Sequence, residues 1–223
     1  EAASGAGQGG RMKARLFSIC YMFLLTLFFT SLVSVVKVVN EERIRLNEEV
    51  RLKRVVLDAL RIPLPGNIPE REAVSDLFAE RVKVREREGR LFYLGYAEAG
   101  ETPVGIAFVV GGPGFWGPIE AMVAVDGSAG VVIGVNFFRH TETPGLGARM
   151  TEPLFRDQFR GLSLKGKGGK PLFRLVPAGT GSSADELDAI TGASQTSEAI
   201  ERFLNRELRL FVESEAMGRG EGT

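Results

Sequence analysis

The chain has 223 residues, which suits one globular domain of ordinary size with an attached segment. Its 28 basic and 28 acidic residues balance to a formal net charge of zero, so it lacks the basic excess of a nucleic-acid-binding protein. One cysteine, Cys20, excludes a disulfide framework, and one histidine, His140, argues against a multi-histidine zinc or haem site, so we expect no bound metal.

The first predicted element is a membrane-spanning helix over residues 16–36, a run of 21 residues without a charge. A helix of this length crosses the roughly 30 Å hydrocarbon core of a bilayer. A cleaved signal peptide would have a shorter apolar region and a small-residue cleavage site, and a soluble core helix is rarely apolar on every face. We therefore expect a single-pass protein with the lipid bilayer as a partner and Cys20 as an apolar filler within it.

Basic residues flank this span on both sides, three before it and six between residues 37 and 54. Counted alone, they favour a cytoplasmic C-terminal domain, but long domains translocate largely regardless of charge, so the orientation stays open. Residues 1–11 are rich in Gly and Ala, and the sequence from Met12 resembles a natural start. We expect residues 1–15 to be a disordered tail.

The next elements lead from the span into a folded domain. Residues 37–69 are expected to form a helical stalk and linker, with a charged helix at 41–60 that ends before Pro63 and Pro65. The domain is expected to cover 70–215, followed by a disordered tail at 216–223. A short helix at 70–80 opens it.

Segments rich in β-formers follow at 91–96, 104–110, 120–125 and 130–138, and Asp126-Gly127 is a hairpin signal. A mixed stretch at 155–162, a short strand at 172–176 and an amphipathic helix at 197–212 close the domain. Strands that run together between helices predict the α+β class.

Residues 112–117, GPGFWG, formally fit the dinucleotide-binding pattern G-x-G-x-x-G. No helix follows them and the next acidic residue comes too soon, so we reject a dinucleotide site. Two interpretations remain. The segment is either a glycine-rich turn with Trp116 covering a core, or the wall of a pocket for a planar ligand that Trp116 contacts.

Residues 140–147, HTETPGLG, must form a loop, because they follow a strand and contain proline and two glycines. Such loops often line sites, whereas a lone histidine at a strand end is more often structural.

Residues 188–197, DAITGASQTS, are the most informative segment. They are either an ordinary helix start with Thr196 or Ser197 as N-cap, or a phosphate-binding turn, because a helix N-terminus favours phosphate and small residues leave room beside a hydroxyl.

Together, GPGFWGPIEAMVAVD (112–126), HTETPGLGAR (140–149) and DAITGASQTS (188–197) resemble the FMN-binding domain of the NqrC and RnfG subunits of sodium- or proton-linked respiratory complexes. Their order and spacing agree, as does the N-terminal span, so the resemblance covers nearly the whole chain. DQFRG (157–161) favours the RnfG type, and Phe115-Trp116 favours the NqrC type. The resemblance implies one FMN-binding domain with a mainly antiparallel sheet flanked by helices, on the periplasmic side of the inner membrane.

The resemblance also implies a covalently bound FMN. A flavin transferase would attach it from FAD with Mg²⁺, through a phosphoester to Ser194, which stands where threonine is commoner in the motif. The implied flavin-binding residues are Asp188, Thr191, Gly192, Ala193 and Thr196 around this serine, His140, Glu142, Thr143, Gly145 and Leu146 of the second segment, and Trp116 and Gly117 of the first.

An electron-transfer subunit of an ion-translocating oxidoreductase is the function that the resemblance implies, with the other membrane subunits of an Rnf- or Nqr-type complex as partners. The redox chemistry would belong to the flavin ring, so no catalytic side chain is expected. Two alternatives remain. One is a stand-alone extracytoplasmic flavin carrier, and the other is a non-redox assembly subunit with a degenerate flavin motif.

Overall fold

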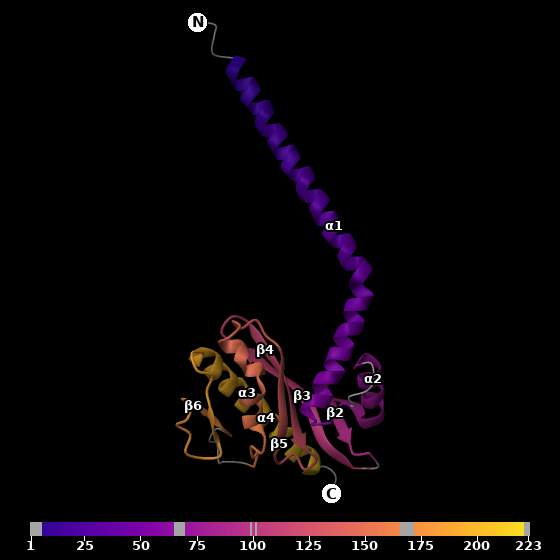
Figure 1. Ribbon diagram of the computed structural model, residues 1–223, viewed down its shortest axis with the longest axis vertical. Helices are drawn as coiled ribbons and strands as arrows, with labels where there is room; N and C mark the ends of the chain where they lie inside the picture. The colour runs from indigo at the N-terminus through magenta and orange to yellow at the C-terminus, as the bar shows by residue number, and fades with distance from the viewer. Residues whose placement is uncertain (1–5, 65–69, 99, 101, 166–171, 221–223) are drawn as a thin grey trace. The chain divides into compact units, whose positions relative to one another are not determined.

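The computed structural model describes residues 6–64, 70–98, 100, 102–165 and 172–220. The chain divides into two units, one ending at Glu49 and a compact domain over Val50–Thr223. Helix α1, Ala6–Ala59, is labelled in Figure 1 and contains both the predicted span and the predicted charged helix. Among the described residues, α1 is the helix that is long and apolar enough to cross a membrane. The expectation of a disordered tail is wrong from Ala6 onward, because residues that extend an existing helix need no new nucleus.

The domain is built on a five-stranded antiparallel sheet with its strands in sequential order (Figure 1). These are β1 (Val82–Arg87), β2 (Arg90–Tyr96), β3 (Pro103–Pro113), β4 (Pro118–Asp126) and β5 (Val132–Arg139). The four predicted β segments and the α+β class are confirmed, but β1 was not expected. Only Val82 of β1 is buried, because β1 is an edge strand with exposed charges, so its sequence lacks the alternation that marks a strand.

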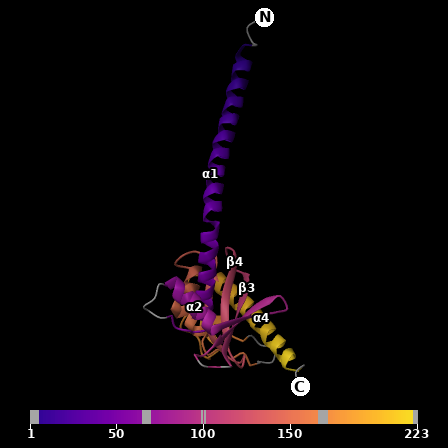
Figure 2. The same cartoon turned by 90° about the vertical axis from the view of Figure 1, so that its right-hand side faces the viewer.

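Both faces of this sheet are covered. On β4, Val123 and Val125 pack into a core with α4 (Ser194–Gly220), whereas Met122 and Ala124 pack into a second core with the end of α1 and with α2 (Glu70–Arg81). Figure 2 shows α2 and α4 on opposite sides of β3 and β4. Successive residues of a strand point to opposite faces, so a strand covered on both sides is apolar at nearly every position.

The end of α1 belongs to the domain rather than to a stalk. Four of its residues, Val55, Val56, Leu57 and Ala59, are buried, as is Leu60 directly after it. The predicted domain start at residue 70 is therefore too late, since the compact unit begins at Val50. An apolar stripe among charged residues packs against the sheet here, as in an ordinary surface helix.

Helix α4 confirms the predicted apolar stripe, because Ile200, Phe203, Leu204, Leu208 and Phe211 are all buried against the sheet. The helix is longer than the predicted 197–212 at both ends, and it includes residues of the tail expected at 216–223. Helix propagation adds one hydrogen bond per residue, so a helix can extend beyond its buried stripe.

A second, two-stranded parallel sheet joins β6 (Arg174–Val176) to β7 (Glu186–Asp188). The buried side chain of Asn205 holds the segment before β6, since its Oδ1 accepts from the Leu172 amide at 2.6 Å and its Nδ2 donates to the Phe173 carbonyl at 3.0 Å. The mixed stretch is η1 (Gly147–Thr151), α3 (Pro153–Arg156) and η2 (Asp157–Phe159). Because β7 leads into the turn before α4, its pairing with β6 fixes where the chain enters that helix.

Asp126 stabilises the β4–β5 hairpin, as its carboxylate accepts from the backbone of Gly130 at 2.7 Å and of Val131 at 2.8 Å, and from the Ser128 hydroxyl. Burial opposes its ionisation, but these hydrogen bonds outweigh burial and lower the pKa of Asp126. A lowered folded-state pKa gives stability that is present above the unfolded-state value and is lost as the pH falls through the folded-state value.

Asp126→Ala should therefore lower the free energy of unfolding by about 1–2 kcal/mol at neutral pH, and the difference should shrink in acid. Urea unfolding of the detergent-solubilised protein at neutral and acidic pH measures both effects. Asp76→Ala, at an exposed position of α2, is the control and should change little. A difference that stays constant from neutral to acidic pH would contradict the assigned role of the ionised carboxylate.

Candidate functional site

A pocket of about 320 Å³ lies where three segments of the domain meet at the start of α4. The β3–β4 turn, the loop after β5 and the turn before α4 all contribute to it. Its lining residues are Phe115, Trp116, Glu142, Thr143, Leu146, Gly147, Gly192, Ala193, Ser194, Gln195 and Thr196. The three segments singled out from the sequence are thus brought together in space.

The β3–β4 turn presents two aromatic rings at the pocket. The Gly114 amide donates to the Gly117 carbonyl at 2.8 Å and closes the turn, which leaves Phe115 and Trp116 at its tip. Their rings meet edge to face at a centroid distance of 4.8 Å, and Trp116 is 66% exposed. Trp116 therefore does not cover a core among the described residues, and its ring is available to a planar ligand.

Glu142 joins all three segments. Its side chain is buried, and Oε1 accepts from the backbone amides of Phe115 at 2.8 Å and Trp116 at 3.1 Å. Its Oε2 accepts from the Thr196 hydroxyl at 2.8 Å, in the first turn of α4. A buried carboxylate needs such donors, because an uncompensated charge would be costly away from water. Glu142 is thus a positioning residue that holds the aromatic turn against the helix start.

Gly147 lies against this hydrogen-bonded pair. A Cβ at position 147 would sit 2.7 Å from both Glu142 Oε2 and Thr196 Oγ1, so only glycine leaves room for their contact. Gly147→Ala should therefore destabilise the domain by about 2 kcal/mol and reduce ligand occupancy of the pocket.

Thermal unfolding of Gly147→Ala and Gly145→Ala, side by side, tests this steric role. Gly145 has a φ of 75°, but a Cβ added to it would meet nothing within 4 Å, so its alanine variant carries backbone strain of about 1 kcal/mol without the clash. Equal losses in the two variants would mean that the contact at Gly147 has no effect of its own.

The turn before α4 places Ser194 at the first residue of the helix. The Ala193 amide donates to the Ile190 carbonyl at 3.0 Å, with Gly192 at a φ of 81° between them. The Ser197 hydroxyl accepts from the Ile190 amide and donates to the Ala193 carbonyl, both at 3.0 Å, which holds the turn on the helix.

Neither Thr196 nor Ser197 is the N-cap expected from the sequence, because both lie inside the first turn of the helix. Their hydroxyls serve tertiary contacts instead, to Glu142 and to the preceding turn. From the sequence alone, a hydroxyl that caps a helix cannot be distinguished from a hydroxyl that makes such tertiary contacts.

The start of α4 is an electropositive position. The first amides of a helix have no intrahelical acceptor, and the helix dipole adds partial positive charge there. No acidic residue of α4 itself lies in its first turn, although Glu142 from the loop after β5 accepts from Thr196 there. Ser194 is exposed at this end, so its hydroxyl lies where a phosphate group is favoured.

Most of the predicted site residues line the pocket: Trp116, Glu142, Thr143, Leu146, Gly192, Ala193, Ser194 and Thr196. Thr191 lines a neighbouring cavity of about 390 Å³ instead, and Ser194 borders both cavities. Gly117 and Gly145 do not line the pocket, and a Cβ on Gly117 would meet the Thr141 hydroxyl at 2.3 Å.

Asp188 and His140 also lie outside the lining. Asp188 has a scaffolding position, since its Oδ1 accepts from the Gly179 amide at 2.8 Å and its own amide donates to Gln158 Oε1 at 2.6 Å. The Nδ1 of His140 is buried with no hydrogen-bond partner within the part of the chain that the structure describes.

Phe115, Gly147 and Gln195 line the pocket although they were not singled out as site residues. Each is next in sequence to a residue that was, so adjacency within the three segments is the signal that could have found them.

These features fit a ligand with a phosphate and a planar ring. The phosphate would lie at the start of α4, where small residues, Gly192 and Ala193, leave access to the Ser194 hydroxyl. The ring would lie toward Trp116 and Leu146, whose side chains are both largely exposed.

Comparisons with known proteins match the part of the chain that contains the three segments. Residues 114–209 match the model of the FMN-binding domain family. The C subunit of the Na(+)-translocating NADH-quinone reductase of Yersinia pestis is 33% identical over 95 residues, which are 42% of this chain and 36% of that protein. Its counterpart from Vibrio campbellii is 28% identical over 145 residues, 61% of this chain and 55% of that protein. The chain thus spans about a third to a half of the length of these relatives.

Two crystal structures show the same fold. The C subunit of the Na(+)-translocating NADH-quinone reductase of Parabacteroides distasonis superposes with a TM-score of 0.63 at 22% identity, covering 75% of this chain and 92% of that one. NqrC of Shewanella oneidensis superposes with a TM-score of 0.64 at 21% identity, covering 76% of this chain and 99% of that one.

Proposed function

Because this chain contains an FMN-binding domain and is distantly homologous to NqrC subunits, we propose that it is an electron-transfer subunit of a membrane oxidoreductase complex of the Nqr or Rnf type. The observation that carries the proposal is the exposed Ser194 hydroxyl, at the first residue of α4 and on the rim of the pocket that the three motif segments form. FMN would be joined through its phosphate to this hydroxyl.

Attachment would be a phosphoryl-group transfer at Ser194. The Ser194 oxygen forms a bond to the FMN phosphorus of FAD, the bond from that phosphorus to AMP breaks, and the hydroxyl proton is released. A flavin transferase with Mg²⁺ is proposed as the catalyst. The free amides at the start of α4 would stabilise the phosphate, and a covalent link would prevent loss of the cofactor outside the cytoplasm.

The protein would then hold and shield the ring. Bound flavin supplies electron transfer in single steps, and the chain supplies binding, orientation and electrostatics. Trp116 and Leu146 line the pocket on the side of the two loops, and Glu142 keeps Trp116 in place through its backbone amide. Thr143, Gly192 and Thr196 complete the wall of the same pocket.

The partners in this proposal are the other membrane subunits of the complex, and the location is the inner membrane. The apolar part of α1 would cross the bilayer once, with the FMN-binding domain on the periplasmic side. A stand-alone flavin carrier would share the pocket but would purify without several multi-span subunits.

The mass of one tryptic peptide tests the attachment. Residues 175–202 contain no internal Lys or Arg and carry the whole motif around Ser194. We expect this peptide to be heavier by one FMN phosphoester, with fragmentation placing the addition on Ser194. An unmodified peptide from cells that contain the transferase would refute covalent attachment and would favour a non-covalent flavin or a non-redox assembly subunit.

A further inference from the structure

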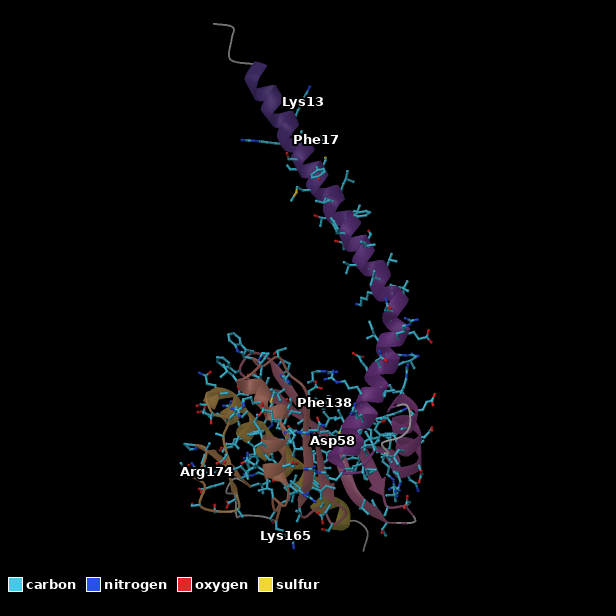
Figure 3. The ribbon with its side chains drawn as sticks, in the orientation of Figure 1. Lys13, Phe17, Asp58, Phe138, Lys165 and Arg174 are labelled. Atoms are coloured by element: carbon cyan, nitrogen blue, oxygen red, sulfur yellow. The ribbon has the colours of Figure 1, made fainter. Side chains whose placement is uncertain are left out.

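A separate cavity, of about 670 Å³, lies along the edge strand β5 and shares no lining residue with the Ser194 pocket. The end of α1, the segment after it, β5 and α3 form it. Figure 3 shows Asp58 of α1 and Phe138 of β5 close together on its wall. We call it the arginine groove, and its lining residues are Arg51, Arg54, Val55, Asp58, Arg61, Ile62, Pro63, Leu64, Asn136, Phe137, Phe138 and Arg156.

Cationic side chains outnumber anionic ones in the lining of this groove. Four arginines line it against one aspartate, Asp58. A further carboxylate, Asp157, lies just outside the lining and pairs with Arg61. A cavity in which cationic groups outnumber anionic ones in this way attracts anions.

The contacts of two arginines leave binding capacity for an anion. Arg51 donates to the Phe138 carbonyl at 2.6 Å, a neutral acceptor that does not cancel its charge. Arg156 pairs with Asp58 at 2.7 Å, and Asp58 also accepts from Asn136 at 2.5 Å. The Nε of Arg156 is buried with no acceptor among the described residues, so one charged donor remains unsatisfied.

Apart from Asn136, the rest of the lining is apolar. Val55, Ile62, Leu64, Phe137 and Phe138 contribute to the same groove as the arginines. A soluble anion would need only the cations, whereas an amphiphile with an anionic head and an apolar chain uses both kinds of side chain. The guanidinium fork binds carboxylate or phosphate oxygens in pairs, and phosphate is the anionic head group that the phospholipids of a membrane offer. We propose that the arginine groove binds the phosphate headgroup of an anionic phospholipid.

The length of the connecting chain allows this contact. Residues 37–50 separate the predicted span from Arg51. The structure has these residues as part of helix α1, so they cover about 20 Å along the helix axis. A helix inclined to the bilayer brings the groove nearer to the headgroup layer than this length. This step rests on the membrane span in the proposed function, and not on the flavin.

Arginine labelling by phenylglyoxal tests the groove in the full chain. The protein is placed in nanodiscs of phosphatidylcholine alone or with added phosphatidylglycerol, and adducts are counted at each arginine by peptide mass spectrometry. We expect Arg51, Arg54 and Arg156 to react roughly fivefold more slowly when phosphatidylglycerol is present. Arg85 on β1 and Arg202 on α4 lie outside the groove, so their rates should not change.

A pair of matched variants links the protection to the groove. Arg51→Gln with Arg54→Gln should abolish the protection of Arg156, whereas Arg85→Gln with Arg202→Gln removes the same charge elsewhere and should preserve it. The flavin content and circular dichroism of both variants should match those of the parent protein, because none of these side chains lines the Ser194 pocket.

Four results would overturn the proposal: equal rates in both nanodiscs, equal slowing at all five arginines, equal protection by sn-glycerol 3-phosphate in phosphatidylcholine discs, or failure of the chain to enter nanodiscs. The third would identify a soluble phosphate ester as the ligand. If the arginines of the groove are protected in a protein that lacks flavin, this result supports lipid binding by the groove and contradicts only the proposed cofactor.

Discussion

Ser194→Ala should produce a folded protein without covalently bound flavin. The hydroxyl is the proposed attachment point, and alanine offers no oxygen for the phosphoester. Ser194 is exposed and makes none of the hydrogen bonds that close the turn before α4, so the free energy of unfolding should change by about 0.5 kcal/mol or less. Flavin fluorescence of the denatured protein in a gel, compared with unfolding curves, measures occupancy and stability separately.

Ser194→Thr is the matched control, because it keeps a hydroxyl at the same position and should retain the flavin. Thr191→Ala should retain it too, since Thr191 lines only the neighbouring cavities. Full flavin occupancy in Ser194→Ala would show that the link is elsewhere or that the flavin is held without a covalent bond. Loss of flavin in Thr191→Ala alone would move the attachment to that residue.

Glu142→Ala should lower the free energy of unfolding by about 3 kcal/mol and weaken flavin binding at the same time. The substitution leaves the Phe115 and Trp116 amides and the Thr196 hydroxyl without their acceptor, and each such buried or part-buried donor costs about 1–3 kcal/mol. Hydrogen exchange of the Phe115 and Trp116 amides should accelerate more than exchange in the β3–β4 ladder. That pattern separates a local release of the turn from general unfolding.

Glu142→Gln supplies a graded test, because its amide oxygen can still accept from the two backbone amides while the charge is lost. It should lose about half as much stability as Glu142→Ala. Glu152→Ala removes an exposed carboxylate that pairs with Arg149 at 3.3 Å, and it should cost less than about 1 kcal/mol. If Glu142→Ala and Glu152→Ala lose equally little, Glu142 does not hold the three segments together.

The central elements of the fold could be predicted because their sequences report burial directly. The stripe of α4 and the apolar run of β4 exist because those side chains are removed from water. By contrast, β1 and β7 depend on pairing with a neighbour more than on their own apolar residues, since each has a single buried residue. The end of α1 was assigned to a stalk because it contains many charged residues. Its apolar face is buried only because the sheet packs against it.

The site was predictable as a set of segments and not as a set of contacts. Local chemistry in residues 188–197 left a phosphate-binding turn as one of two interpretations, and only the family resemblance implied that the phosphate joins Ser194. The role of Glu142 depends on donors that lie 27 and 54 residues away in sequence, and no local pattern encodes those distances. Asp188 is the opposite case. It is prominent in the motif, but its hydrogen bonds with Gly179 and Gln158 hold the scaffold.

Glu142 contacts residues that are far away in the sequence, and this separation bears on the order in which the chain folds and acquires its cofactor. Contacts between residues distant in sequence form late, because the loops that they close must first be ordered. The aromatic turn and the start of α4 should therefore become joined only after β3, β4, β5 and α4 have packed, and we expect a half-folded chain to have no assembled pocket around Ser194. Flavin incorporation, if it requires that pocket, then reports on completed folding, and a colourless fraction of the protein is a measure of the chains that failed to finish.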